Sequence, residues 1–220
     1  MIRGIVFDMD GLMFDTERLA QQGWAYAGQQ LGLDIPSELI LSIVGLDAEG
    51  SKRVFLDALD LDLDFAAFRK TRLDYVKNYI EKNGVPQKPG LVDLLEYLRC
   101  HQYRIVVATS TESARTNYYL KKAELTRFFD AIVCGDAVVN RKPAPDIYLK
   151  ACETIRVAPG ECLALEDSPI GILAADRAGM MPVMIPDIVP PDEATKKLLF
   201  AQLSSLFDVI ALLDRTRTDG

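Results

Sequence analysis

The sequence predicts an α/β fold: a doubly wound parallel sheet with an all-helical domain inserted after its first strand. From Gly90 to Ile185, short apolar segments rich in β-branched residues alternate with segments of helical periodicity. This alternation is typical of parallel strands that helices cover on both faces. Between residues 16 and 83 the sequence contains helical patterns and no convincing strand. A chain of 220 residues is long enough for one full core and a smaller second unit.

The strands and the helices between them can be assigned in chain order. We expect strands at Gly4 to Asp8, Arg104 to Thr109, Ala131 to Cys134, Leu163 to Glu166 and Pro182 to Ile185, with a weaker one at Phe207 to Ile210. We expect helices at Leu91 to Cys100, Glu112 to Lys122, Asp146 to Ile155 and Ile170 to Ala178. Because strand and helix alternate, crossover connections make these strands parallel.

The inserted segment has its own helical pattern and a turn-rich end. Its expected helices are Thr16 to Leu31, Ser37 to Val44, Glu49 to Leu59 and Phe65 to Ile80. Gly84, Pro86, Pro89 and Gly90 then mark the return to the first domain. We therefore expect one domain from residues 1–15 with 88–220, and a helical domain from residues 16–87.

Composition and charge limit the partners of this chain. The net charge is −7, the pI is near 4.8, and no cluster of Lys and Arg runs along the sequence, so we expect no nucleic-acid partner. No apolar run approaches the ~20 residues that span a bilayer, and no signal peptide precedes the first strand, so we expect no membrane association and a cytoplasmic location. No apolar seam is left unassigned, which favours a monomer. His101 is the only histidine, which disfavours triads and zinc sites based on histidine.

Polar residues follow the expected strands, at the sheet edge where open parallel sheets bind ligands. The first strand ends in Asp8-Met9-Asp10-Gly11, and the fourth ends in Glu166-Asp167-Ser168. If these ends converge, four carboxylates surround one crevice, and each pair ~4 Å apart repels by about 1 kcal/mol in water and ~4 kcal/mol at an effective dielectric of 20. Such a cluster needs a cation or protonation. Ligands that are all oxygen atoms indicate Mg²⁺.

The same residues can carry out phosphoryl transfer. Asp8, at the end of the strand, can attack phosphorus as a nucleophile, while Asp10 protonates the leaving oxygen and then deprotonates water. The hydroxyl of Thr109 and the cation of Lys142 can neutralise the phosphate oxygens. The residues expected to contact the substrate are Gly11, Thr16, Thr109, Ser110 and Lys142.

Each of these features also has an ordinary structural explanation. An Asp-x-Asp-Gly sequence is often a turn, Ser110 or Thr111 could cap the following helix, and Lys142 alone is typical of a solvated surface. The acidic stretch from Glu166 could merely begin the next helix with favourable charge. These explanations do not account for all four features appearing in order at successive strand ends, so the functional interpretation is favoured.

The motifs resemble those of the haloacid dehalogenase superfamily, in the branch of subfamily I with a helical C1 cap that includes beta-phosphoglucomutase and small sugar-phosphate phosphatases. The matching segments are residues 8–17, Thr109-Ser110, Lys142-Pro143-Ala144-Pro145-Asp146, residues 166–171 and Ala178-Gly179-Met180. The resemblance implies a Rossmann-like catalytic core with a helical cap. It also implies Mg²⁺ held by Asp8, the backbone carbonyl of Asp10 and Asp167, with Glu166 a ligand directly or through water.

Three functions remain open on this fold. Hydrolysis of a small phosphate monoester, such as a sugar phosphate, is favoured, because Asp10 and the acidic pair at 166–167 distinguish the chain from dehalogenases. A phosphomutase is the first alternative, but Ala20 stands where the mutase branch usually has a histidine, and the stretch Gly45-Leu46-Asp47-Ala48 lacks the arginine expected there. A catalytically silent binding module is the third, and it would require a lost motif residue, whereas none is missing.

Overall fold

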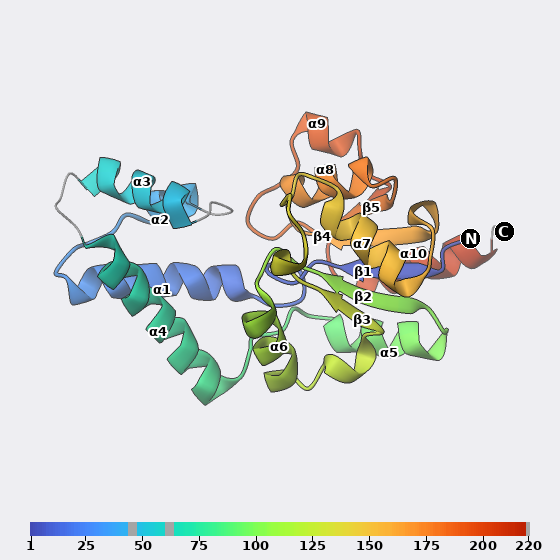
Figure 1. Cartoon of the computed structure of the whole chain (residues 1–220), viewed down its shortest axis with the longest axis horizontal. Helices are drawn as coiled ribbons and strands as arrows, with labels where there is room; N and C mark the ends of the chain where they lie inside the picture. The colour runs from blue at the N-terminus through green and yellow to red at the C-terminus, as the bar shows by residue number, and fades with distance from the viewer. Residues whose placement is uncertain (44–47, 60–63, 219–220) are drawn as a thin grey trace. The chain divides into compact units, whose positions relative to one another are not determined.

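The computed structural model describes residues 1–43, 48–59 and 64–218, which form two compact units. Met1–Phe14 and Gln87–Gly220 make up the first, which we call the sheet unit, and Asp15–Pro86 make up the second, the helical unit (Figure 1). None of the helices in the described part of the chain has the length and apolar character needed to cross a bilayer.

The sheet unit contains a six-stranded sheet in which every neighbouring pair is parallel. The strand order is β3-β2-β1-β4-β5-β6, so β1 lies between β2 and β4 at the centre. The strands are β1 (Gly4–Phe7), β2 (Arg104–Ala108), β3 (Ala131–Val133), β4 (Cys162–Glu166), β5 (Met181–Met184) and β6 (Ala201–Gln202). The register sets Phe7 opposite both Val107 and Leu165, which brings the ends of the three central strands level.

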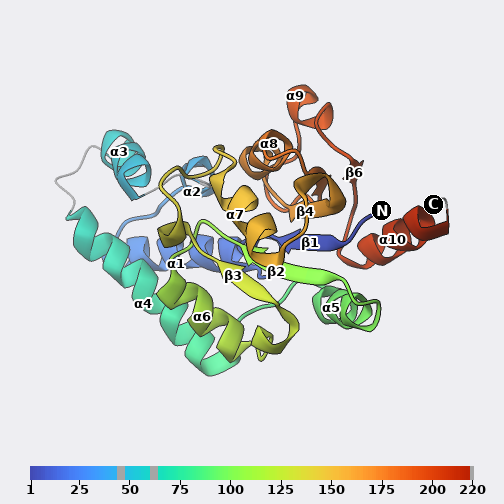
Figure 2. The same ribbon diagram turned by 45° about the vertical axis from the view of Figure 1, so that its right-hand side comes forward.

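Helices cover this sheet, and the core forms where they meet it (Figure 2). They are α5 (Leu91–Cys100), α6 (Ser113–Lys122), α7 (Asp146–Ile155), α8 (Pro169–Arg177), α9 (Glu193–Lys196) and α10 (Phe207–Thr218), with short 3₁₀ turns at Thr126–Phe128, Gly135–Ala137 and Pro159–Glu161. α7 packs on β1, β2 and β3, and α8 on β4 and β5, while α5 packs against α10. All four residues of β1 and all five of β4 are buried, as the apolar runs predict.

The helical unit is built around aromatic side chains. Its helices are α1 (Thr16–Gln30), α2 (Ser37–Ser42), α3 (Ala48–Leu59) and α4 (Phe65–Asn83). The ring of Trp24 lies 4.8 Å from that of Phe55 and 5.0 Å from that of Phe68, measured between centroids. Asp64 caps α4 by accepting a hydrogen bond from the backbone N–H of Ala67. This cluster gives the unit a core of its own.

The predicted fold class is confirmed, and one predicted strand is wrong. Residues 207–210 begin α10, and the sixth strand is the two-residue β6 before it. Val209 and Leu213 are buried at helical spacing. The carboxylate of Asp208 also accepts hydrogen bonds from the backbone N–H groups of Ser204 and Ser205, which satisfies donors ahead of the helix. A segment of four residues, three of them apolar, is too short to distinguish a strand from a buried helix turn.

The other predicted elements differ from the observed ones mainly at their ends. The helix expected from Glu112 begins one residue later, and the one expected from Ile170 begins at Pro169. The short helix α9 was not predicted. The end of the predicted helix Ser37 to Val44 lies partly outside the described residues, as do Gly45, Leu46 and Asp47 of the mutase comparison.

Candidate active site

Three central strands end at one edge of the sheet, each with a polar residue. Asp8 follows β1, and its backbone N–H donates to the carbonyl of Leu165 at 3.0 Å. Thr109 follows β2, and Glu166 is the last residue of β4. Because the strands are parallel and in register, Asp8 lies between the other two ends. All three residues are buried, Glu166 completely.

Lys142 joins two of these strand ends. It lies in the loop before α7, and its Nζ is 2.5 Å from Oδ1 of Asp8 and 2.7 Å from Oε1 of Glu166. The same Nζ also donates to the carbonyl of Ala108 at 3.2 Å. Its side chain is only 7% exposed, so this lysine is not the solvated surface residue that its sequence context allows. The positive charge of Lys142 is thus fixed between two carboxylates. Its removal would leave both negative charges without a counter-charge.

Tyr148 completes this group, and the sequence did not single it out. The residue lies on α7 and is fully buried. Its hydroxyl is 2.6 Å from Oε1 of Glu166 and 3.1 Å from Nζ of Lys142. In the sequence it occupies the apolar face of an amphipathic helix and is typical of a core residue. The available signal was its hydroxyl group, which needs a partner when the ring is buried.

The second oxygen of Glu166 is held by its own loop. Oε2 accepts from the hydroxyl of Ser168 at 3.0 Å and from the backbone N–H of Asp167 at 3.2 Å. Ser168 also caps α8, because its Oγ accepts from the N–H of Gly171 at 3.1 Å. A Cβ at position 171 would overlap the carboxylate of Glu166, so only glycine fits there. Both carboxylate oxygens are therefore fixed.

Three acidic residues form a group with the spacing of a metal site. Asp8, Glu166 and Asp167 each offer a carboxylate oxygen, and these oxygens all lie within 4.8 Å of one another. Gly11 lies beside them with a left-handed φ of +83°, and a Cβ there would overlap the carboxylate of Asp167. A set of oxygen ligands with a glycine that leaves room beside it suits a hard divalent cation. Asp10 is not part of this group, and its predicted backbone contribution to a metal stays a prediction.

Asp10 is instead held by a residue from the next strand end. The hydroxyl of Thr111 donates to Oδ2 of Asp10 at 2.6 Å, and the N–H of Thr111 donates to Oγ1 of Thr109 at 3.1 Å. The sequence offered Ser110 or Thr111 as a cap for α6, but the N-cap is Glu112, which makes no side-chain capping bond. The side chain of Thr111 thus points toward Asp10 and does not cap α6, which its position in the sequence does not indicate.

Burial and charge set the protonation of this cluster. Burial raises the pKa of Asp8 to about 7, Lys142 opposes the rise, and Glu166 adds to it. Burial also disfavours the charge on Lys142, but the two carboxylates outweigh it and hold the pKa of the lysine well above its usual value. Burial and the neighbouring Glu166 raise the pKa of Tyr148 well above its usual value, so its hydroxyl stays a donor. The lysine is a fixed cation, and Asp8 needs further positive charge to be fully ionised at neutral pH.

Ser110 and Thr16 are two further residues predicted to contact the substrate. Ser110 is exposed at the end of β2, and its backbone carbonyl lies so close to Gly135 that a Cβ there would overlap it. Thr16 begins α1 in the helical unit, where it is buried. The roles expected for both remain predictions.

Comparison with known proteins agrees with this geometry. The model of the haloacid dehalogenase-like hydrolase family matches residues 5–185. A phosphorylated carbohydrates phosphatase of Thermotoga maritima is 30% identical over 179 residues, which cover 81% of this chain and 82% of that protein. A probable pseudouridine-5'-phosphatase of Drosophila melanogaster is 36% identical over 190 residues, covering 83% and 80%.

A solved structure extends the similarity to nearly the whole chain. The crystal structure of a protein described as a putative beta-phosphoglucomutase from Thermotoga maritima has a TM-score of 0.84 and 25% identity, and the match covers 97% of this chain and 99% of that one. The family expected from the motifs is therefore confirmed. This chain belongs to the haloacid dehalogenase-like hydrolase family.

Proposed function

We propose that this protein is a Mg²⁺-dependent phosphatase that hydrolyses a small phosphate monoester through an aspartyl-phosphate intermediate on Asp8. The observation that carries the proposal is the position of Lys142, whose Nζ lies 2.5 Å from Asp8 and 2.7 Å from Glu166 at the ends of two central strands. The lysine holds Asp8 in place and brings positive charge to where a phosphate would be attacked. Burying a lysine between two carboxylates carries a desolvation cost that an apolar side chain would avoid, which favours a functional role.

The reaction takes place in two displacements. An Asp8 carboxylate oxygen attacks phosphorus and forms an acyl-phosphate bond, while the ester P–O bond breaks and the leaving oxygen takes a proton from Asp10. Water then attacks the same phosphorus, Asp10 takes its proton, and inorganic phosphate leaves as Asp8 is regenerated. The 2.6 Å bond from Thr111 holds Asp10 through both steps. The backbone turn at Gly11 leaves space beside Asp167.

Asp8 and Asp167, with Glu166 directly or through water, are the described residues that would hold Mg²⁺, since their oxygens converge and no nitrogen or sulfur ligand accompanies them. Bound there, the ion supplies charge that neutralises the phosphate oxygens and lowers the pKa of Asp8 from about 7. Side chains of the protein position these carboxylates. Lys142 orients Asp8, and Ser168 fixes Glu166 at 3.0 Å.

The proposed substrate is a small phosphorylated metabolite, such as a sugar phosphate. The relatives support this class, because one is named for phosphorylated carbohydrates and another for pseudouridine 5'-phosphate. We propose that the helical unit is a cap that excludes water and large substrates from the site, and that Thr16 at its start contributes to substrate binding.

The test uses purified protein with Mg²⁺ and p-nitrophenyl phosphate, followed by a panel of metabolite esters scored by phosphate release. Asp8→Asn, which keeps the shape of the side chain, should reduce turnover at least a thousandfold while the circular dichroism spectrum is kept, since the amide cannot form the acyl phosphate. Turnover in Asp8→Asn equal to the wild type would refute the nucleophile. Preference for phosphoproteins over all small esters would refute the substrate class.

A phosphomutase is the second candidate, because the chain matches over 97% of its length a structure described as a putative beta-phosphoglucomutase. Ala20, which is buried on α1, offers no imidazole at the position where that branch usually has one. Incubation with beta-glucose 1-phosphate, followed by ³¹P NMR, separates the two reactions. Release of inorganic phosphate supports hydrolysis, whereas accumulation of glucose 6-phosphate supports the mutase.

A further inference from the structure

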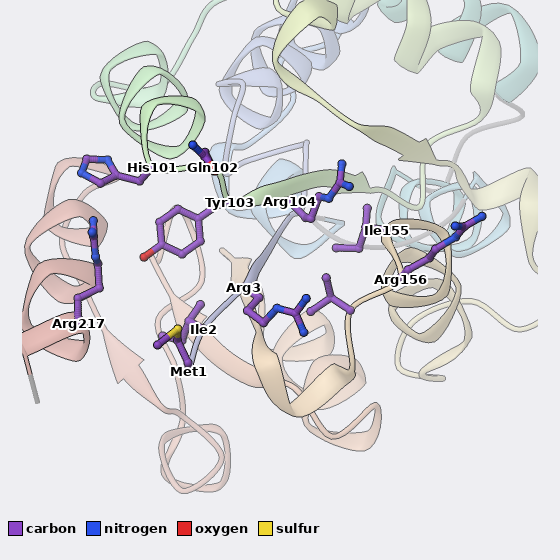
Figure 3. A pocket seen from close by; sticks show the side chains of 11 residues that line it. Met1, Ile2, Arg3, His101, Gln102, Tyr103, Arg104, Ile155, Arg156 and Arg217 are labelled. Atoms are coloured by element: carbon purple, nitrogen blue, oxygen red, sulfur yellow. The ribbon is translucent and has the colours of Figure 1, made fainter. Parts of the chain in front are cut away.

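A cavity of about 420 Å³ lies at the edge of the sheet where the strands begin, opposite to the edge that carries Asp8 (Figure 3). Its lining comes from four segments that are distant in the sequence. They are the residues before β1, the turn before β2 with the first residue of that strand, the last residue of α7 with the two residues after it, and the end of α10. None of the residues proposed for catalysis lines it, so the cavity is independent of the proposed function.

The lining of this cavity is basic although the chain is acidic. Asp and Glu outnumber Lys and Arg in the whole chain by 32 to 25. Among the described residues that line the cavity there are four arginines and no Asp or Glu. The arginines are Arg3, Arg104, Arg156 and Arg217. A concave site lined by one sign of charge concentrates ions of the opposite sign.

Carboxylates outside the cavity neutralise this charge only in part. Arg3 pairs with Glu161 at 3.2 Å and Arg104 with Asp130 at 3.2 Å, and the side chains of both arginines are 60% exposed. Exposed pairs of this kind contribute little free energy and leave the guanidinium groups available to another anion. Within the described ranges, no carboxylate lies within ion-pair distance of Arg156.

Arg156 also occupies an unusual backbone position. It follows α7 with a φ of 56°, in the left-handed region where glycine is the usual residue after a helix. Gln102, which lines the same cavity, follows α5 with a φ of 60°. A side chain at such a position costs about 1 kcal/mol. Polar side chains at the cavity thus occupy two backbone positions, Gln102 and Arg156, where glycine would avoid this cost.

The buried part of the lining, which we call the floor, is apolar. Tyr103 is 7% exposed, and Ile155 and Val157, which also line the cavity, are buried. Burial raises the pKa of Tyr103, the charge of Arg217 opposes the rise, and the charge of Asp214, outside the cavity lining, adds to it. In Figure 3, Arg217 and His101 stand on one side of the cavity and Arg104 and Arg156 on the other. The cavity thus has cations on two sides of an apolar floor.

We propose that this cavity binds a small organic anion with two or more phosphate or carboxylate groups, held by Arg104 and Arg156 on one side and Arg217 on the other. Guanidinium groups bind both kinds of oxyanion with paired hydrogen bonds. Cations on two sides favour a ligand with at least two anionic groups, and the apolar floor favours an organic one. The volume is in the range of small-molecule sites, roughly 300 to 1,000 Å³.

His101 makes a direct test possible, because it is the only histidine of the chain and lines this cavity. Its ring Hε1 signal in a ¹H NMR spectrum therefore reports this site and not the edge at Asp8. The wild-type protein, freed of divalent ions with a chelating resin, is titrated with pyrophosphate in one arm and citrate in the other, and with NaCl at matched ionic strength. A saturable shift with pyrophosphate, citrate or both, which NaCl does not reproduce, is the expected result. The arm that saturates identifies the anionic group.

Three variants complete the experiment. Arg156→Gln and Arg217→Gln should each weaken the apparent affinity by about tenfold or more, since each removes charge-assisted hydrogen bonds. Arg69→Gln makes the same charge change on an exposed face of α4 and should bind like the wild type. If Arg217→Gln alters the fold of α10, Arg156→Gln decides, because this arginine has no described ion pair to lose. A shift that follows ionic strength alone, or equal affinity in Arg156→Gln and the wild type, overturns the proposal.

Discussion

The hydroxyl of Tyr148 lies 2.6 Å from Oε1 of Glu166, the same oxygen that accepts a hydrogen bond from Lys142 at 2.7 Å. Both side chains are fully buried, and the tyrosine comes from α7 while the glutamate ends β4. The packing of α7 on the sheet therefore fixes the lysine that contacts Asp8. Tyr148 acts through Lys142 and Glu166 and is a positioning residue.

Tyr148→Phe keeps the ring and removes the hydroxyl. We expect kcat to fall by about tenfold with little change in KM, because Lys142 and Glu166 lose a shared partner. The free energy of unfolding should fall by about 1 to 2 kcal/mol, since a buried hydrogen bond to a charged group is lost. Steady-state kinetics and urea denaturation measure the two effects. Tyr79→Phe makes the same change on α4 and should leave kcat unaltered, whereas an unaltered kcat in Tyr148→Phe would contradict the positioning role.

Thr111→Val removes the 2.6 Å hydrogen bond to Asp10 and keeps the shape of the side chain. Without this bond the protonated carboxyl group of Asp10 spends less time where it can donate to the leaving oxygen, so kcat should fall by about three- to tenfold. Thr111→Ser restores a hydroxyl and should recover most of the loss. If the serine and valine variants have equal kcat values, the hydroxyl has no part in holding Asp10.

Mg²⁺ should stabilise the protein against heat. At a hundred times its dissociation constant, a ligand of the folded state adds about 2.7 kcal/mol, which corresponds to a Tm increase of roughly 5 to 10 °C for a chain of this size. Asp167→Asn removes one of the three converging carboxylates and should weaken the apparent Mg²⁺ affinity about tenfold or more. Differential scanning fluorimetry with and without EDTA measures both values.

Asp176→Asn is the matched control for this experiment, because the residue is exposed on α8 and lies outside the acidic group. Its response to Mg²⁺ should equal that of the wild type. Equal responses of Asp167→Asn and Asp176→Asn would show that the ion binds elsewhere.

Gly171→Ala tests how closely α8 approaches the site. The added Cβ overlaps the carboxylate of Glu166, which must move. We expect kcat to fall by about tenfold or more, and the free energy of unfolding to fall by about 1 to 3 kcal/mol. At Gly160 the nearest atom to an added Cβ is 3.9 Å away, so Gly160→Ala should change neither quantity beyond about 0.5 kcal/mol. A fully active Gly171→Ala variant would mean that Glu166 can move without cost.

The sequence by itself determined the fold class and the location of the candidate site. Strands buried on both faces give continuous apolar runs, and the ends of parallel strands meet at one edge, so the sequence alone predicts that Asp8, Thr109 and Glu166 lie together. These inferences rest on periodicity and chain order, which are local properties. The same local pattern was too short at residues 207–210, where a helix turn and a strand fit equally well.

Only the tertiary structure decided which side chains meet across elements. Tyr148 and Thr111 resemble a core residue and a helix cap in the sequence, and their contacts with Glu166 and Asp10 exist because α7 and the end of β2 pack where they do. The basic cavity shows the same limit, since no run of arginines marks it and its four arginines are spread between positions 3 and 217. Spacing along a chain predicts contacts within one helix or strand. Contacts between residues of different elements, such as Tyr148 with Glu166, depend on how the sheet and helices pack in space.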